Sequence, residues 1–307
     1  MAAVAAGATH VQGTLNGYGE RTGNADLVTI IANLELKKKK EVLPANALRE
    51  AFRISHAVAE VTNISPSPRQ PYTGVSAFAH KAGLHASAIK VDPMLYQHED
   101  PSSVGNDMRM LVSDMAGRAS IELKSQELGV DLGGDRELIT RIVEKVKAME
   151  AQGFTFEAAD ASFELLLLEE STGKRPSFFS IDHWLTTTEH DVDGTIITKA
   201  EVTVTAQGKE ITCSGAGNGP VNAFDTALRD GLNELYPQIS SLELTDYKVR
   251  ILEGRLGTGA ITRVLIETSD GKGEWNTVGV HENVIAASAM ALEDALTFGL
   301  LRQGLKP

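Results

Sequence analysis

Polar side chains crowd a short glycine-rich stretch near the start of the sequence. Asn16, Glu20 and Asn24 follow residues 9–15, which we interpret as a buried strand. A helical pattern covers residues 25–34, so the polar residues lie in a strand-to-helix turn. In α/β enzymes, turns at the carboxyl ends of strands carry the chemistry. Carboxylate and amide oxygens in such a turn could bind a divalent cation or transfer a proton.

Each of these side chains also has a purely structural interpretation. Glu20 and Arg21 could form an ion pair that braces the turn, and Asn24 could cap the helix that follows it. A single asparagine cannot hold Mg²⁺ or Mn²⁺, because such sites need several oxygen or imidazole ligands in fixed geometry. We therefore expect Asn24 to bind a metal only within a more complete site.

Two histidines mark a second candidate region. His80 and His85 lie in the stretch Ser76-Ala-Phe-Ala-His-Lys-Ala-Gly-Leu-His85, and Tyr96 follows it. A spacing of five does not place both histidines on one face of a helix. A histidine in an apolar, glycine-containing stretch is more often structural than catalytic. The residues alone therefore leave both roles open.

A second glycine-rich turn, Gly215-Ala-Gly-Asn-Gly-Pro220, leads into a predicted helix over 220–235. Gly217 and Gly219 would let backbone amides approach a ligand, and the helix N-terminus attracts an anion such as a carboxylate. Val221 and Asn222 would flank that ligand. The alternative is an ordinary strand-to-helix turn with proline near the first helical position.

The middle of the chain is helical and small-residue rich. Amphipathic spacing predicts helices over 46–62, 81–90, 117–129 and 135–150. Asp160 is expected to cap a further helix that carries Phe163, Leu166 and Leu167.

Strand signals dominate after residue 174, which gives the chain an α+β fold class. The predicted order is three strands and a helix, twice over: 178–187, 197–205, 209–214 and 220–235, then 243–252, 260–268, 274–280 and 283–301. This is an internal βββα repeat of roughly 64 residues. Each repeat helix is expected to have one apolar face. One unit cannot bury both faces of its sheet, so we expect the two units to pack together and to leave a surface for a second copy.

The composition limits the classes of partner. A formal net charge of -12 disfavours binding to nucleic acid or to an anionic membrane. Cys213 is the only cysteine, which excludes an intrachain disulfide and fits a reducing cytoplasm. We see no apolar run as long as a membrane span. The expectation is a cytoplasmic protein that binds neither nucleic acid nor membrane.

Three motifs together resemble a known enzyme family. They are Gly13-Thr-Leu-Asn-Gly-Tyr-Gly-Glu-Arg-Thr-Gly-Asn24, the stretch from Ser76 to His85, and the block from Asp246 to Arg302. The same motifs occur in this order in the 2-isopropylmalate, homocitrate and citramalate synthases. The amino-acid sequences of the motifs are most similar to those of the citramalate synthases. The resemblance implies a remnant of the catalytic TIM barrel over 1–35, helical linker subdomains over 36–174, and a regulatory and dimerisation domain of two βββα repeats over 175–307.

The resemblance also implies roles for individual residues. Glu20, His85 and Tyr96 are expected at the catalytic site, where His85 would move a proton to or from acetyl-CoA or the forming alkoxide. Asn24 is expected to be one ligand of a divalent metal (Mg²⁺, Mn²⁺ or Zn²⁺). Gly217, Gly219, Val221 and Asn222 are expected to line a feedback site for isoleucine.

The implied reaction is the condensation of acetyl-CoA with pyruvate to (R)-citramalate, in isoleucine biosynthesis, by a homodimer. A TIM barrel needs about 250 residues. The resemblance therefore implies that this chain is a C-terminal fragment, inactive alone and unable to hold the metal by itself.

Three alternatives stay open. One is a 2-isopropylmalate synthase with leucine as its effector. Another is a non-catalytic dimerisation module that senses an amino acid, and the third is a structural remnant without a ligand.

Overall fold

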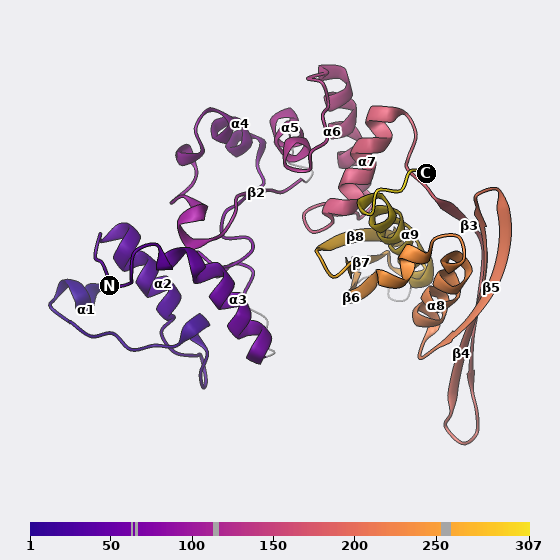
Figure 1. Ribbon diagram of the computed structural model, residues 1–307, viewed down its shortest axis with the longest axis horizontal. Helices are drawn as coiled ribbons and strands as arrows, with labels where there is room; N and C mark the ends of the chain where they lie inside the picture. Colours follow the sequence, from indigo (N-terminus) through magenta and orange to yellow (C-terminus); the bar gives the residue numbers. More distant parts are fainter. Residues whose placement is uncertain (63, 65–66, 113–116, 253–258) are drawn as a thin grey trace. The chain divides into compact units, whose positions relative to one another are not determined.

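The computed structural model describes residues 1–62, 64, 67–112, 117–252 and 259–307 (Figure 1). Contacts divide the chain into two compact units, Met1–Leu111 and Val112–Pro307. Helices and antiparallel sheets are both present, in keeping with an α+β chain.

The first unit is mainly helical. Its helices are α1 (Ala2–Ala5), α2 (Leu27–Ala32), α3 (Ala51–Thr62) and α4 (Gly83–Val91). Two very short strands, β1 (Ala79–His80) and β2 (Arg109–Met110), pair in parallel. A small core holds these elements together and consists of Ala32, Leu48, Tyr72, Phe78 and Val104.

The predicted strand over residues 9–15 is wrong for this structure. Those residues lack strand conformation, and only an isolated parallel bridge joins Thr14 to Asp26. A strand exists only where its backbone groups pair with a neighbouring strand, and the described part of this unit offers none beside it. The polar turn that follows is nevertheless fixed, because Asp26 caps α2 by accepting hydrogen bonds from the backbone amides of Val28 and Thr29.

Three helices open the second unit: α5 (Arg118–Glu127), α6 (Arg136–Ala151) and α7 (Asp160–Thr172). Their apolar faces form one core with Val278 and Val280. The sequence predicts that Asp160 caps α7, and this prediction is wrong: Asp160 is the first helical residue of α7. Its carboxylate pairs instead with the buried Lys124 ammonium at 2.9 Å, an interaction that local sequence does not reveal.

Two three-stranded antiparallel sheets follow, each succeeded by a helix (Figure 1). The first comprises β3 (Phe179–His190), β4 (Ile196–Ala206) and β5 (Lys209–Gly217), with α8 (Pro220–Asn233) packed on it. The second comprises β6 (Glu243–Ile251), β7 (Thr262–Ser269) and β8 (Glu274–His281), with α9 (Val284–Arg302) packed on it. The first strand of each sheet carries a register shift near its start, between Ile181 and His183 and between Leu244 and Asp246. The two sheets thus share their order, their pairing and an irregularity.

Helix α9 corrects two sequence expectations. An 18-residue window of this 19-residue helix has a mean hydropathy of 1.6, so α9 is long and apolar enough to cross a membrane, although Glu293 and Asp294 interrupt the apolar run. The helix is buried around most of its circumference rather than on one face, because α7 packs against it in addition to its own sheet. With 61% of the apolar window buried inside the second unit, α9 is packed as the core helix of a folded domain.

Candidate functional site

The polar turn before α2 is held by its own hydrogen bonds. The Asn24 side-chain amide donates to the Tyr18 carbonyl at 3.1 Å, so Asn24 stabilises the turn. The structural interpretation of the sequence expected Asn24 to cap the helix that follows, and the structure does not show that cap. Glu20 and Arg21 form the expected ion pair at 3.4 Å, with side chains 87% and 86% exposed. A pair so exposed contributes little to stability.

A divalent metal needs more ligands than this turn provides. Among the described residues, no group of three or more His, Cys, Asp or Glu side chains is placed to hold a metal ion. The Asn24 side chain is therefore not part of a metal site that these residues could complete, and the donor set does not fit such a metal by itself.

The second candidate region does bring two predicted residues together. His85 lies on α4 and Tyr96 ends the short turn after it. Their rings stack, with centroids 4.1 Å apart and planes at 29°. The neighbours Leu84 and Leu95 are 71% and 60% exposed, so the stacked pair lies at an open surface of the first unit.

His80 lies next to the His85 ring of this pair. Its ring centroid is 6.1 Å from that of His85, and its buried Nε2 atom has no hydrogen-bond partner among the described residues. Burial lowers the pKa of His80, and the charges of His85 and His98 lower it further. His80 is thus favoured as a neutral imidazole beside the partly exposed His85.

The two groups of predicted catalytic residues remain separate. In the described part of the first unit, no hydrogen bond, ion pair or ring contact joins Glu20 or Asn24 to His85 or Tyr96. The structure therefore assembles half of the predicted set.

The glycine-rich turn before α8 opens onto a cavity of about 770 Å³. Three of the four predicted effector residues line it, namely Gly219, Val221 and Asn222. Gly217 does not, because it packs against the start of α8. A Cβ atom added at Gly217 would lie 2.6 Å from the Ala223 amide nitrogen, whereas one added at Gly219 would meet nothing within 4 Å.

Sequence reasoning missed other lining residues, among them three that carry polar groups into the cavity wall. Asp225 and Arg229 follow Val221 at intervals of four, so they share its helix face, and that spacing could have revealed them. Tyr247 comes from β6 and could not be found from local pattern. Its hydroxyl is 2.8 Å from the Ser288 hydroxyl, which fixes its position at the cavity wall.

The cavity combines three kinds of group. Asp225 is largely buried and pairs with Arg229 at 2.8 Å, and burial raises the pKa of Asp225 although Arg229 opposes that rise. The N-cap of α8, Gly219, has no side-chain cap, so backbone amides at the helix start remain available to an anion. Leu242 and Leu244 add apolar wall. A small zwitterion with an aliphatic side chain matches this combination.

Family models match three consecutive parts of the chain. The HMGL-like model matches residues 1–58, and the homocitrate synthase post-HMGL domain-like model matches residues 72–153. The LeuA allosteric (dimerisation) domain model matches residues 157–300 and therefore covers both three-stranded sheets and the cavity at the start of α8.

Curated relatives match along the whole chain. The (R)-citramalate synthase of Streptomyces coelicolor is 64% identical over 307 residues, which is 100% of this chain and 58% of that protein. The (R)-citramalate synthase of Aquifex aeolicus is 43% identical over 304 residues, covering 98% of this chain and 57% of that protein. The 2-isopropylmalate synthase of Methanocaldococcus jannaschii is 28% identical over 302 residues, covering 96% and 55%. The chain spans about half the length of these relatives, and along its own whole length it is similar to the (R)-citramalate synthases.

Proposed function

We propose that these residues form part of an (R)-citramalate synthase, a cytoplasmic acyltransferase that condenses acetyl-CoA with pyruvate. The 64% identity to the Streptomyces coelicolor enzyme along the whole chain is the observation that carries this proposal. In the whole synthase, residues 1–35 would belong to the catalytic TIM barrel, 36–174 to linker subdomains, and 175–307 to a regulatory domain of two βββα repeats.

The stacked pair of a partly exposed His85 and an exposed Tyr96 supports a role in proton transfer. The His85 imidazole could accept a proton from the methyl group of acetyl-CoA or return one to an alkoxide. The stacked phenol of Tyr96 would fix the plane of the His85 ring and so aim its nitrogen atoms. Glu20 would contribute a carboxylate from a different loop.

A divalent metal (Mg²⁺, Mn²⁺ or Zn²⁺) is proposed for the whole synthase only. Asn24 would supply one oxygen ligand, and its other ligands would come from parts of the synthase that this chain does not span. We therefore propose that this chain alone does not catalyse the condensation.

The cavity at the start of α8 is proposed as the isoleucine feedback site. The amides at the α8 N-terminus would bind the carboxylate, Asp225 would accept the ammonium group, and the leucines of the wall would contact the side chain. The match to a dimerisation domain supports a homodimer.

A hybrid enzyme tests the catalytic proposal. These 307 residues would replace the corresponding part of the Streptomyces coelicolor synthase, because the alignment to that enzyme covers 100% of this chain. We expect the hybrid to release CoA from acetyl-CoA and pyruvate, and the isolated chain to release none. A folded hybrid without activity, or an active isolated chain, would contradict the proposal.

Two other functions have some support. The 28% identity to a 2-isopropylmalate synthase favours leucine biosynthesis with leucine as the effector. The long match to the allosteric domain model also fits a module that senses an amino acid without catalysis. A preference for leucine would favour the 2-isopropylmalate synthase. An inactive hybrid that still binds an amino acid would favour the sensing module.

A further inference from the structure

A second cavity, of about 250 Å³, lies inside the second unit among α6, α7, β8 and α9. It shares no lining residue with the cavity at the start of α8. Most of its wall is apolar and consists of Met149, Phe154, Phe156, Leu166, Val278 and Met290. Three charged side chains, Arg175, Glu293 and Asp294, face it as well.

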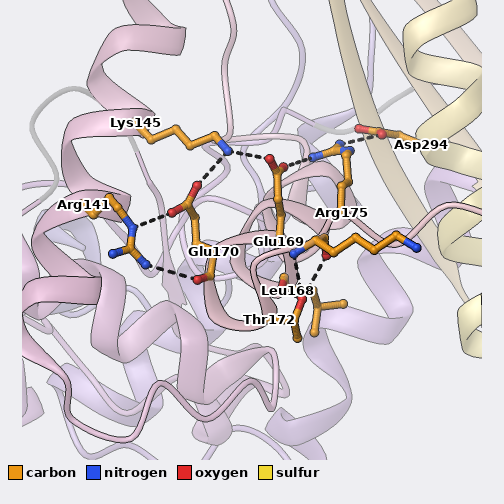
Figure 2. A network of polar contacts seen from close by, with 9 residues as sticks. Arg141, Lys145, Leu168, Glu169, Glu170, Thr172, Arg175 and Asp294 are labelled. Carbon is orange, nitrogen blue, oxygen red and sulfur yellow. Dashed lines mark hydrogen bonds and ion pairs between the residues drawn. The ribbon is translucent and has the colours of Figure 1, made fainter.

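Two of these three charges are matched within the protein. Arg175 Nη2 donates to Asp294 Oδ1 at 2.7 Å, and Arg175 Nη1 donates to Glu169 Oε2 at 3.1 Å (Figure 2). The other oxygen of Asp294 accepts a hydrogen bond from the Ser162 hydroxyl at 2.7 Å, and that hydroxyl accepts one from the Val278 amide. Arg175 and Asp294 are therefore satisfied without a ligand.

The network continues away from the cavity and remains balanced. Lys145 bridges Glu169 and Glu170 at 2.9 and 2.8 Å, and Arg141 binds Glu170 at 2.8 Å (Figure 2). Its three basic side chains (Arg141, Lys145, Arg175) match three acidic ones (Glu169, Glu170, Asp294).

Glu293 is the negative charge that remains. Among the described residues it has no hydrogen-bond or ion-pair partner within 4.0 Å, although it is only partly exposed. Burial raises the pKa of Glu293 and the neighbouring Asp294 raises it further, whereas the charge of Arg175 opposes this rise without forming an ion pair with Glu293. A positive group in the cavity would relieve both effects.

We propose that this cavity binds a small primary alkylamine, with its ammonium group on Glu293 and its alkyl chain against the methionine and phenylalanine wall. The unmatched carboxylate selects a cation, and the apolar wall selects one with a hydrocarbon tail. A metal ion is disfavoured, because no group of three or more potential metal ligands occurs among the described residues. A carboxylate ligand is disfavoured as well, since Arg175 is already paired twice and Glu293 would repel it.

Methionine-methyl NMR provides a local readout of this site. The chain has seven methionines, of which Met149 and Met290 line the cavity and Met94 lies exposed in the first unit. The full chain, labelled with ¹³C-methyl methionine, would be titrated with isoamylamine. Isovalerate and isoamyl alcohol are matched probes of the same shape without the positive charge.

We expect isoamylamine to shift the Met149 and Met290 resonances at saturation and to leave Met94 unchanged. Glu293→Gln should weaken this binding tenfold or more. Glu164→Gln is the matched control, because Glu164 is another partly buried carboxylate of raised pKa that does not line the cavity.

Three results would overturn the proposal. One is equal binding of isovalerate or isoamyl alcohol, and another is unchanged amine binding by Glu293→Gln. The third is a set of Met149 and Met290 shifts that follow protein concentration without added amine, because a lysine from a second copy would then occupy the cavity. The outcome is independent of condensing activity.

Discussion

Arg175 and Asp294 lie 119 positions apart in the sequence, yet their side chains meet at 2.7 Å. Arg175 sits in the segment between α7 and β3, and Asp294 is in the middle of α9. The pair therefore fixes the start of the first sheet against the helix of the second (Figure 2). Because Asp294 is only 9% exposed, its charge depends on this partner.

Arg175→Met is predicted to destabilise the second unit by about 3 kcal/mol, because the substitution leaves a buried carboxylate unpaired. Lys124→Met is the matched control. Lys124 is fully buried, but its partners Glu127 and Asp160 have side chains 35% and 47% exposed, so water can solvate them. We expect the control to change stability by less than about 1 kcal/mol.

Urea unfolding followed by tryptophan fluorescence measures both variants. Trp184 and Trp275 are the only tryptophans and both lie in the second unit, so the signal reports that unit alone. If both variants lose the same free energy of unfolding, then the burial of the remaining acidic partner does not determine the loss of stability.

Two glutamates should change stability with pH in opposite directions. Hydrogen bonds from Lys145 and then Arg141 lower the pKa of Glu170, so its contribution is present at neutral pH and is lost as pH falls. Burial raises the pKa of Glu293 above 4.5, so its contribution is present in acid and is lost as pH rises through the raised value.

Accordingly, Glu170→Gln should be less stable than the wild type at pH 7, with a difference that shrinks toward pH 4. Glu293→Gln should be more stable than the wild type at pH 7, and that gain should also vanish toward pH 4. Thermal unfolding between pH 4 and 8 checks both. A gain for Glu293→Gln that is constant with pH would contradict the stated origin.

The two glycines before α8 should respond differently to a side chain. Gly217→Ala should cost about 1–3 kcal/mol, because its Cβ would press on the backbone of α8. Gly219→Ser should add a helix cap and stabilise by a few tenths of a kcal/mol, while its side chain enters the effector cavity. Stability is measured by urea unfolding and isoleucine affinity by calorimetry. A Gly219→Ser variant that binds isoleucine as well as the wild type would argue against this cavity.

His85 should affect chemistry without affecting folding. In the hybrid synthase, His85→Gln is expected to lower the rate of CoA release by about 10²–10⁴-fold, the usual contribution of a general acid or base. The stability of the chain should change by no more than about 0.5 kcal/mol, as for a surface substitution. His183→Gln is the control, since His183 is an exposed histidine on β3. Equal activity of the two variants would remove His85 from the proposed catalytic set.

Much of the fold is predictable from the sequence, because its elements carry strong periodic patterns. Both sets of three strands and a helix appear in the predicted order, with ends displaced by a few residues. The predicted strand at 9–15 failed because a strand depends on a neighbour that its own sequence cannot supply. The cap at Asp160 failed because a buried lysine 36 positions earlier competes for the carboxylate.

The sites divide in the same way. The turn before α8 is predictable, since glycines and a proline precede an amphipathic helix. Tyr247, which completes that cavity, is not, because it comes from another element. The stacking of His85 on Tyr96 is a matter of loop geometry across ten residues, which no periodic pattern encodes.

The most direct test of the account is a calorimetric titration of the purified chain with isoleucine. Leucine and valine, which are similar in structure, are titrated separately for comparison. We expect isoleucine to bind most tightly to a dimeric chain, and Asp225→Asn to weaken that binding tenfold or more. The control Asp230→Asn, an exposed carboxylate on the same helix, should bind like the wild type. A preference for leucine, or no binding of any of the three by a folded dimer, would contradict the assignment of this chain to an isoleucine-regulated citramalate synthase.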